Sequence, residues 1–229
     1  SQADVVLQGE EHLDWAGAEI ATGDFDGDGV DDILVGAPWR GNEEDGSPGI
    51  AYIVLGPVSG TVPLSSADAM ITGRNDGSND EIGLELALGD ADGDGVLDVF
   101  AATTFDSRGV STFIFLGPLS GTRSVTEADA ALSLDGYPYL PGHTLALGDV
   151  DGDGRGDVLV GAPVPTTARS DTGRAYLVYG PVDGAYDLGS AEIFIQWIDN
   201  QSVFCIDQAA SSQVQRVLDQ YSYMTPEEQ

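Results

Sequence analysis

Short apolar runs separated by glycine-rich polar turns recur along the chain. Three of them directly follow an acidic turn, at residues 33–35, 99–101 and 158–160. Three longer runs that include aromatic residues come next and end in Gly-Pro, at residues 50–55, 112–116 and 175–179. Apolar runs of this length bounded by turn residues are typical of β-strands, so the pattern predicts strands rather than long helices.

Two further segments complete a repeating unit. A run that begins with a small residue and an acid follows each Gly-Pro turn, at residues 67–71, 128–132 and 191–195, and residues 3–7 form a fourth copy of it. The residues before each acidic turn, such as 19–22, also alternate as a strand does. One unit is therefore predicted to hold four short strands in about 60 residues, which is close to the size of a propeller blade.

The acidic turn of each unit carries one motif. Aspartates stand at positions 1, 3, 5 and 9 of residues 24–32, 90–98 and 149–157, with glycines at positions 4 and 6. Two unit charges about 4 Å apart interact by about 4 kcal/mol at an effective dielectric constant of 20, so four converging carboxylates favour a cation between them. The ligands are hard oxygens with no histidine or cysteine nearby, which favours Ca²⁺ over zinc, copper or magnesium.

We therefore predict three structural calcium ions. Each is expected to bind four carboxylates and the backbone carbonyl of position 7. The predicted ligands are Asp24, Asp26, Asp28, Val30 and Asp32 in the first turn, Asp90, Asp92, Asp94, Val96 and Asp98 in the second, and Asp149, Asp151, Asp153, Arg155 and Asp157 in the third. An EF-hand is excluded, because it needs a glutamate at position 12 and flanking helices, whereas Val35, Ala101 and Val160 stand there between strands.

These motifs resemble the FG-GAP repeats of integrin α-chains and of glycosylphosphatidylinositol-specific phospholipase D. The resemblance covers residues 1–196 and rests on the acidic turns, on the Gly-Asp that opens each turn, and on Gly-Ala-Pro at residues 36–38 and 161–163. It implies a β-propeller with calcium in the loop that joins the first two strands of a blade. The sequence departs from the family in two places: Ala16, Ile82 and Pro141 replace the phenylalanine before the repeat's glycine, and residues 101–103 read Ala-Ala-Thr.

The predicted fold is all-β, with propeller blades of four antiparallel strands in three FG-GAP repeats over residues 1–196. Residues 197–229 lack the acidic turn and are predicted to include a short C-terminal helix that begins near Ser212 and ends before Pro226. A closed propeller needs about four to eight blades. Three explanations remain open: a longer propeller, assembly with a second copy through open blade edges, or a closing element formed by residues 197–229.

The formal net charge of −31 excludes a nucleic-acid partner and argues against docking on anionic lipid, while 41% hydrophobic residues are enough for a folded core. No apolar run is long enough for a membrane span, so no membrane insertion is expected. The single cysteine, Cys205, cannot form an internal disulfide. The tripeptide at residues 155–157 reads Arg-Gly-Asp, but Asp157 is a predicted calcium ligand, so we do not interpret it as an adhesive motif.

Strand alternation places the calcium turns and the Gly-Pro turns at one end of the blades and the remaining loops at the other. Those remaining loops hold residue types that often anchor binding surfaces, namely Trp39, Arg40, Arg108, Tyr137, Tyr139 and Arg169. We predict a secreted or cell-surface, calcium-stabilised, non-catalytic module for adhesion or binding to a protein or surface partner. The alternatives are an accessory or catalytic domain of a secreted, phospholipase D-like hydrolase, and a carbohydrate-binding propeller.

Overall fold

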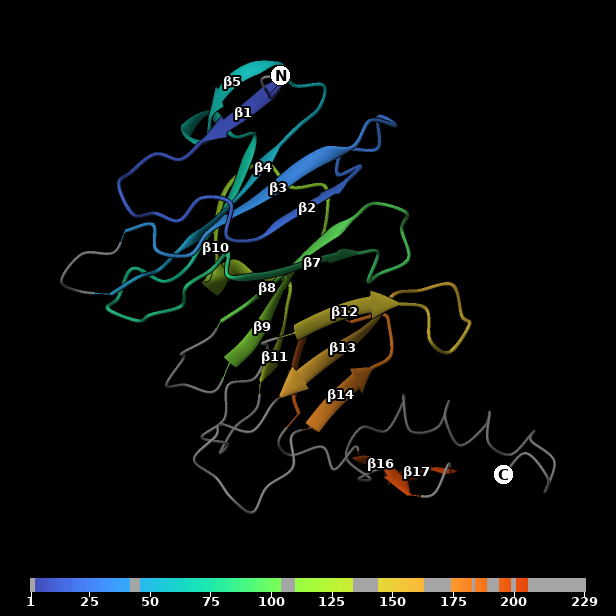
Figure 1. Cartoon of the computed structure of the whole chain (residues 1–229). Coiled ribbons are helices and arrows are strands. Elements are labelled where there is room, and N and C mark those ends of the chain that lie inside the picture. The colour runs from blue at the N-terminus through green and yellow to red at the C-terminus, as the bar shows by residue number, and fades with distance from the viewer. Residues whose placement is uncertain are drawn as a thin grey trace.

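The chain is all-β in the computed structural model, which describes residues 3–41, 46–103, 110–133, 144–162, 174–182, 184–188, 194–198 and 201–205. The sheets of the three repeat units follow one another in chain order, so that each lies against the next (Figure 1). Within the described residues no helix is long and apolar enough to cross a membrane. The predicted C-terminal helix lies outside the described residues.

Four-stranded antiparallel blades form as predicted in the first two units. Blade 1 contains β2 (Ile20–Gly23), β3 (Asp32–Ala37), β4 (Ile50–Val54) and β6 (Ala69–Thr72). Blade 2 contains β7 (Glu85–Gly89), β8 (Asp98–Ala102), β9 (Val110–Phe115) and β11 (Ala130–Ser133). Blade 3 shows its first three strands, β12 (Thr144–Gly148), β13 (Asp157–Ala162) and β14 (Arg174–Val178). The open edges of these sheets are consistent with an incomplete propeller.

Each unit also contains a strand that the sequence pattern did not predict. It follows the Gly-Pro turn and pairs in parallel with the outer strand of the preceding unit. These strands are β5 (Gly60–Pro63) on β1 (Val5–Gln8), β10 (Gly121–Ser124) on β6, and β15 (Gly184–Asp187) on β11. The first two run into short 3₁₀ turns, η1 (Leu64–Ser66) and η2 (Val125–Glu127). Each of these strands has four residues, the first a glycine, and shows no clear alternation of apolar and polar side chains. Only the tertiary pairing therefore identifies them.

The strand predicted at residues 191–195 is placed differently. The described strand β16 (Phe194–Ile198) starts three residues later and pairs with β17 (Gln201–Cys205) as an antiparallel hairpin. It therefore does not join β14 as the fourth strand of blade 3. The short link between Ile198 and Gln201 allows the two strands to pair locally.

The core lies between consecutive sheets. Leu34 of β3 and Ile53 of β4 are fully buried in one cluster with Val99 and Phe115 of blade 2. A second cluster joins blade 2 to blade 3 and includes Phe100 of β8. Blades therefore bury both faces against neighbours, which explains why their middle strands are nearly continuous apolar runs.

One close backbone contact between blades explains the glycine of the Gly-Ala-Pro motif. A Cβ atom on Gly36 would lie only 1.9 Å from the carbonyl oxygen of Gly83, the repeat glycine of the next unit. Gly83 has a φ angle of +102°, which also favours glycine. Both glycines are required because β3 and the entry to blade 2 approach more closely than any side chain permits.

Candidate functional site

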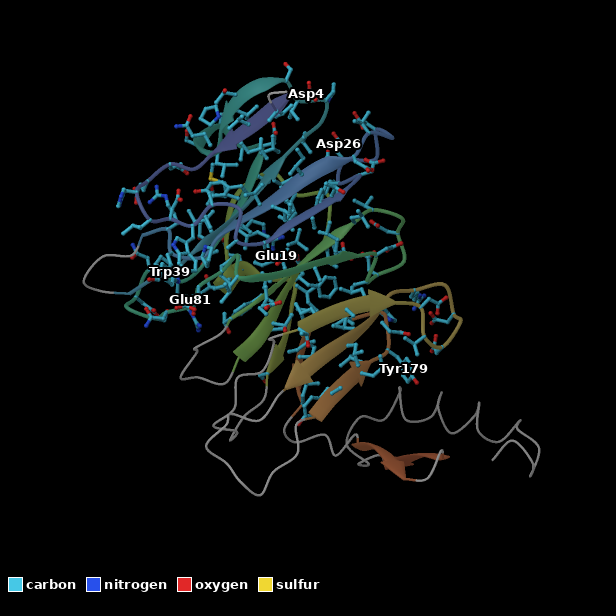
Figure 2. The ribbon with its side chains drawn as sticks, in the orientation of Figure 1. Asp4, Glu19, Asp26, Trp39, Glu81 and Tyr179 are labelled. Carbon is cyan, nitrogen blue, oxygen red and sulfur yellow. The ribbon has the colours of Figure 1, made fainter. Side chains whose placement is uncertain are left out.

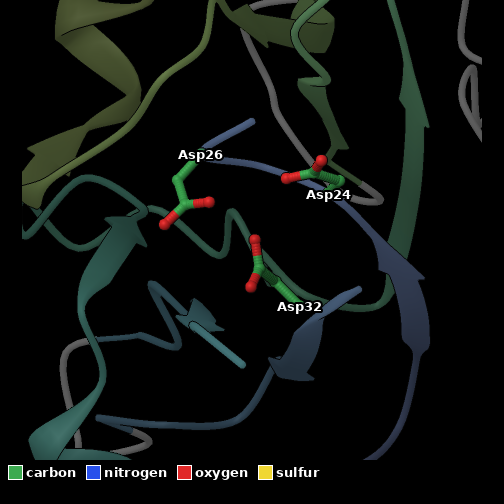
Figure 3. Close-up of side chains that lie close together, drawn as sticks. All are labelled: Asp24, Asp26 and Asp32. Carbon is green, nitrogen blue, oxygen red and sulfur yellow. The ribbon is translucent and has the colours of Figure 1, made fainter. Parts of the chain in front are cut away.

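The three acidic turns join the first and second strands of their blades, as the sequence predicted. In the first turn, Asp24, Asp26 and Asp32 place carboxylate oxygens within 4.8 Å of one another. Their side chains converge on a common space from one loop (Figure 3). The corresponding oxygens of Asp149, Asp151 and Asp157 converge in the third turn, and those of Asp90, Asp92 and Asp94 in the second.

The position 1 aspartate organises each turn. Asp24 accepts hydrogen bonds from the backbone N–H groups of Gly27 at 2.7 Å, Asp28 at 3.1 Å and Gly29 at 2.9 Å. Asp90 and Asp149 accept the equivalent bonds at nearly the same distances. Glycines at positions 4 and 6 have φ angles of +79° to +89° in all three turns, a conformation that side chains disfavour.

The position 9 aspartate is buried and connects two turns. Asp32 is 1% exposed. One of its oxygens accepts from the N–H of Phe25 at 2.7 Å, and the other accepts from the N–H of Gly56 in the Gly-Pro turn at 2.7 Å. Asp98 and Asp157 make the same two bonds to their own turns. The acidic turns and the Gly-Pro turns therefore lie at the same end of the blades, as predicted.

Burial makes the carboxylate of Asp98 harder to ionise without a cation. The pKa of Asp98 is raised to about 6, mainly because burial disfavours its charge and also because Asp92 and Asp90 repel it. The N–H groups of Gly117 and Ala91 oppose this rise but do not cancel it. A divalent ion beside the carboxylates would offset both effects.

The structure brings together some of the predicted ligands of each site. In the first and third turns, the position 5 aspartates Asp28 and Asp153 do not belong to the carboxylate cluster. In the second turn, the position 9 aspartate Asp98 does not belong to it. Asp28 instead accepts from the N–H of Val30 at 2.7 Å. The three acidic donor sets suit a hard divalent cation. The full set of twelve aspartates and three carbonyls stays a prediction.

The opposite end of the blades carries an aromatic pair that the sequence did not reveal. Trp39 follows β3, and its ring stacks on Trp15 with 3.7 Å between ring centroids and 24° between planes. Trp15 is 50% exposed, and Leu13 beside it is 60% exposed. Trp39 lies at the far end of the sheet from Asp26 (Figure 2). We call these three residues the aromatic face.

Buried and paired polar groups hold the aromatic face in place. Asp14 is 7% exposed, and its carboxylate accepts from the N–H groups of Glu10, Glu11 and Ala16. It thereby fixes a loop in which Leu13 and Trp15 have φ angles of +68° and +57°. Such positive φ angles cost free energy for residues other than glycine and often mark functional positions.

Arg40 connects this loop to blade 1. Its guanidinium pairs with Glu10 at 3.3 Å and with Glu11 at 2.7 Å, and Glu10 also accepts from the hydroxyl of Tyr52 at 2.7 Å. Burial first, and then the bond to Glu10, raises the pKa of Tyr52 above its ordinary value. The Nε atom of Arg40 is buried and has no hydrogen-bond partner among the described residues.

A cavity of about 500 Å³ opens beside Arg40. Its other walls include Ile50, Thr72 and Arg74. Arg74 forms an ion pair with Asp80 at 2.5 Å, and Asp80 is fully buried. The backbone N–H of Arg74 also donates to the carboxylate of Asp80 at 2.6 Å, which closes this loop.

Two of the binding residues predicted from the sequence, Trp39 and Arg40, are described and lie at this end. The others, Arg108, Tyr137, Tyr139 and Arg169, lie outside the described residues. Trp15, Asp14 and the Arg74–Asp80 pair were missed. Asp14 and Asp80 share one position, three residues before the repeat glycines Gly17 and Gly83, but Tyr139 stands there in the third unit, so the sequence did not single them out.

Comparisons with known proteins agree with the repeat motifs. A family model for the FG-GAP repeat matches residues 16–54 and 141–178. The chain is 30% identical over 198 residues to integrin alpha pat-2 of Caenorhabditis briggsae. The aligned region covers 79% of this chain and 15% of that protein. It is 32% identical over 169 residues to rat integrin alpha-7, covering 72% of this chain and 14% of that protein.

Human integrin alpha-IIb is 31% identical over 169 residues, covering 68% of this chain and 15% of that protein. The chain therefore corresponds to only about one seventh of the length of these relatives. The second unit, with Ala-Ala-Thr at residues 101–103, is not matched by the family model, but its turn has the same hydrogen bonds as the other two. The chain thus contains FG-GAP repeats, is similar to integrin α-chains, and has the β-propeller architecture that these repeats imply.

Proposed function

We propose that this chain is a calcium-stabilised, extracellular, non-catalytic module that recognises a protein or surface partner. The observation that carries the proposal is the threefold repetition of one acidic turn at one end of the blades, opposite a rigid aromatic face. The similarity to integrin α-chains supports an adhesive role.

Calcium is proposed as a structural ion. Three ions would change the formal charge from −31 to −25, since each adds two positive charges. They would also offset the repulsion between converging carboxylates that the position 1 and position 9 hydrogen bonds hold in place. Extracellular sites of this kind bind calcium at about 10⁻⁴ to 10⁻³ M, a concentration that the cytosol does not supply. We therefore place the module outside the cell.

The aromatic face is proposed as the recognition surface. Aromatic residues and arginine are the commonest anchors of interfaces, and preorganised loops bind with less loss of conformational entropy. The exposed side of Trp15 is available to a partner. A surface glycan is a second candidate partner, because the Trp15–Trp39 pair offers a flat aromatic surface.

Adhesion of the chain to purified extracellular matrix and to intact cells tests the recognition surface. We expect retention of the labelled wild-type chain in 1 mM CaCl₂, which is about the upper end of the dissociation constants of extracellular calcium sites. We expect at least about tenfold weaker retention of Trp15→Ala, which corresponds to a loss of about 1.4 kcal/mol. Val150→Ala, at an exposed position in the third acidic turn, is the matched control. Equal retention of Trp15→Ala and wild type would show that partners bind elsewhere.

A further inference from the structure

We propose that Arg155 weakens the binding of a divalent cation at the second acidic turn, so that the three turns are not equivalent cation sites. Arg155 belongs to the third acidic turn, but its side chain lies against the second. The inference rests on the calcium binding of the proposed function, and it adds to that function the role of one cationic side chain.

The Arg-Gly-Asp tripeptide at residues 155–157 joins the third turn to the second. The carboxylate of Asp157 is 1% exposed and accepts from N–H groups of its own unit, so it does not face a separate protein. The N–H of Gly156 donates to the carbonyl oxygen of Asp90 at 2.8 Å. A Cβ atom on Gly156 would lie 2.6 Å from that same oxygen, so glycine is required where the two turns meet.

The side chain of Arg155 covers the second turn at position 4. A Cβ atom placed on Gly93 would lie 3.1 Å from Cγ and 3.6 Å from Nε of Arg155. A Cβ atom placed on the equivalent Gly27 or Gly152 would have no atom within 4 Å. Of the three turns, therefore, only the second has a described arginine side chain against position 4.

The charge of this arginine acts on the place where a cation would bind. Gly93 lies between Asp92 and Asp94, which form the carboxylate cluster of the second turn together with Asp90. Arg155 is exposed and forms no ion pair with a described residue, so no partner in the described part of the chain neutralises its charge. A divalent cation that enters the cluster is therefore repelled by the neighbouring guanidinium.

The first and second turns meet without such a charge. Position 7 holds Val30 in the first turn and Val96 in the second, where the third has arginine. Their contact is apolar, because a Cβ atom on Gly23 before the first turn would lie 2.3 Å from Cδ1 of Leu97 in the second. The second turn also differs in its cluster, which contains the position 5 carboxylate in place of the position 9 carboxylate. Both observations separate the second turn from the others.

Calcium titration of the full chain by isothermal calorimetry tests the role of Arg155. Arg155→Val gives the third turn the residue that the other two turns have at position 7 and leaves the backbone carbonyl in place. We expect the largest of the dissociation constants to fall by about threefold or more, because the change removes a unit charge beside a divalent ion. Arg155→Lys keeps the charge and is the matched control, which should bind calcium nearly as the wild type does.

Two carboxylate variants assign the effect to one turn. Asp92→Ala removes a donor from the second turn, and Asp26→Ala removes the equivalent donor from the first. In the Asp92→Ala chain, adding Arg155→Val should leave the affinities of the remaining ions unchanged. In the Asp26→Ala chain, adding Arg155→Val should still tighten one site by the same factor as in the wild type.

Salt gives a readout that a purely structural role of Arg155 would not change. The Debye length falls from about 10 Å at 0.1 M ionic strength to about 3 Å at 1 M, so the difference between wild type and Arg155→Val should nearly vanish at 1 M.

Three results would overturn this inference alone: calcium binding that Arg155→Val leaves unchanged at the lower ionic strength, a difference that persists at the higher one, or an equal effect of Arg155→Val in the Asp92→Ala chain. A wild-type chain that binds no calcium at any turn would overturn the calcium-stabilised module together with this inference. Calcium binding by the wild type therefore distinguishes the two failures.

Discussion

The two ends of the blades are held together by different kinds of interaction. At the acidic end, the N–H of the position 4 glycine lies 2.7, 2.7 and 2.6 Å from the position 1 aspartate in the three turns. At the opposite end, the two described entry loops share one bond, in which the buried Asp14 or Asp80 accepts from the N–H of Glu10 or Arg74, but their other contacts differ. One loop is fixed by the buried carboxylate of Asp14, and the next by the ion pair of Arg74 and Asp80.

This difference separates calcium-dependent stability from recognition. At the acidic end, the same hydrogen bonds hold repelling carboxylates together in all three turns. The stability of this end should therefore depend on a bound cation. The opposite end depends on local pairs of buried groups, which differ from loop to loop and can present different side chains to a partner. Calcium should therefore affect the first end and leave the second end nearly unchanged.

The largest effect is expected at the non-repeated end, from Arg74→Met. It leaves the carboxylate of Asp80 buried without its guanidinium partner, which costs about 3–5 kcal/mol of unfolding free energy. Urea unfolding measures the loss, which should be equal with and without calcium. The double variant Arg74→Met/Asp80→Asn should recover part of it. A loss that disappears in calcium would mean that the two ends are coupled.

An intermediate effect is expected at the acidic end, from Asp32→Ala measured in EDTA. The N–H of Phe25 loses its buried acceptor, at about 1–3 kcal/mol, while the N–H of Gly56 is only half-buried and loses less. Asp26→Ala is the control, because its carboxylate is exposed and accepts one bond, from Asp28, within its own turn. Equal losses of unfolding free energy for the two variants in EDTA would contradict a structural role for position 9.

The smallest effect is expected from Asp129→Asn, compared with the same change at the equivalent position 68 of blade 1. Burial alone would raise the pKa of Asp129, but the bonds from Arg123 and from the N–H of Leu116 outweigh it, so the pKa is lowered. A lowered pKa contributes stability above the unfolded value of about 3.9 and loses it as the pH falls through the folded value. Asp129→Asn should therefore cost about 0.5 kcal/mol at pH 7, as exposed pairs do.

This cost should fall toward zero when urea unfolding is repeated at pH values below the lowered folded-state pKa of Asp129, where both states bind the proton. The control is Asp68→Asn in blade 1. Asp68 makes the same bond to the N–H of Leu55, but Val62 stands where blade 2 has Arg123. A pH dependence as large for Asp68→Asn as for Asp129→Asn would exclude the ion pair as its cause.

The repeated parts of the fold were predictable from the sequence. Period and turn chemistry identified four strands in each of the first two units and the three acidic turns, because each turn sets its own conformation through glycine and aspartate. The strands β5, β10 and β15 were missed, since they are stable only on the outer strand of the preceding unit. The predicted fourth strand of blade 3 was misplaced because residues 194–205 pair locally.

The acidic turns were found because one short segment supplies all of their donors. The aromatic face needs Trp15 and Trp39 from two loops, and no local signal connects them. Trp39 was predicted as a binding residue from its type, whereas Trp15 required the stacked geometry. Residues brought together by tertiary structure were therefore the part that sequence reasoning missed.

We propose that each of the three acidic turns binds one calcium ion. Native mass spectrometry of the chain equilibrated with calcium counts the ions per chain directly. We expect three for the wild type and two for Asp26→Ala/Asp28→Ala, since that change removes donors from the first turn only. A wild-type chain without bound calcium, or a double variant that still binds three ions, would contradict the account.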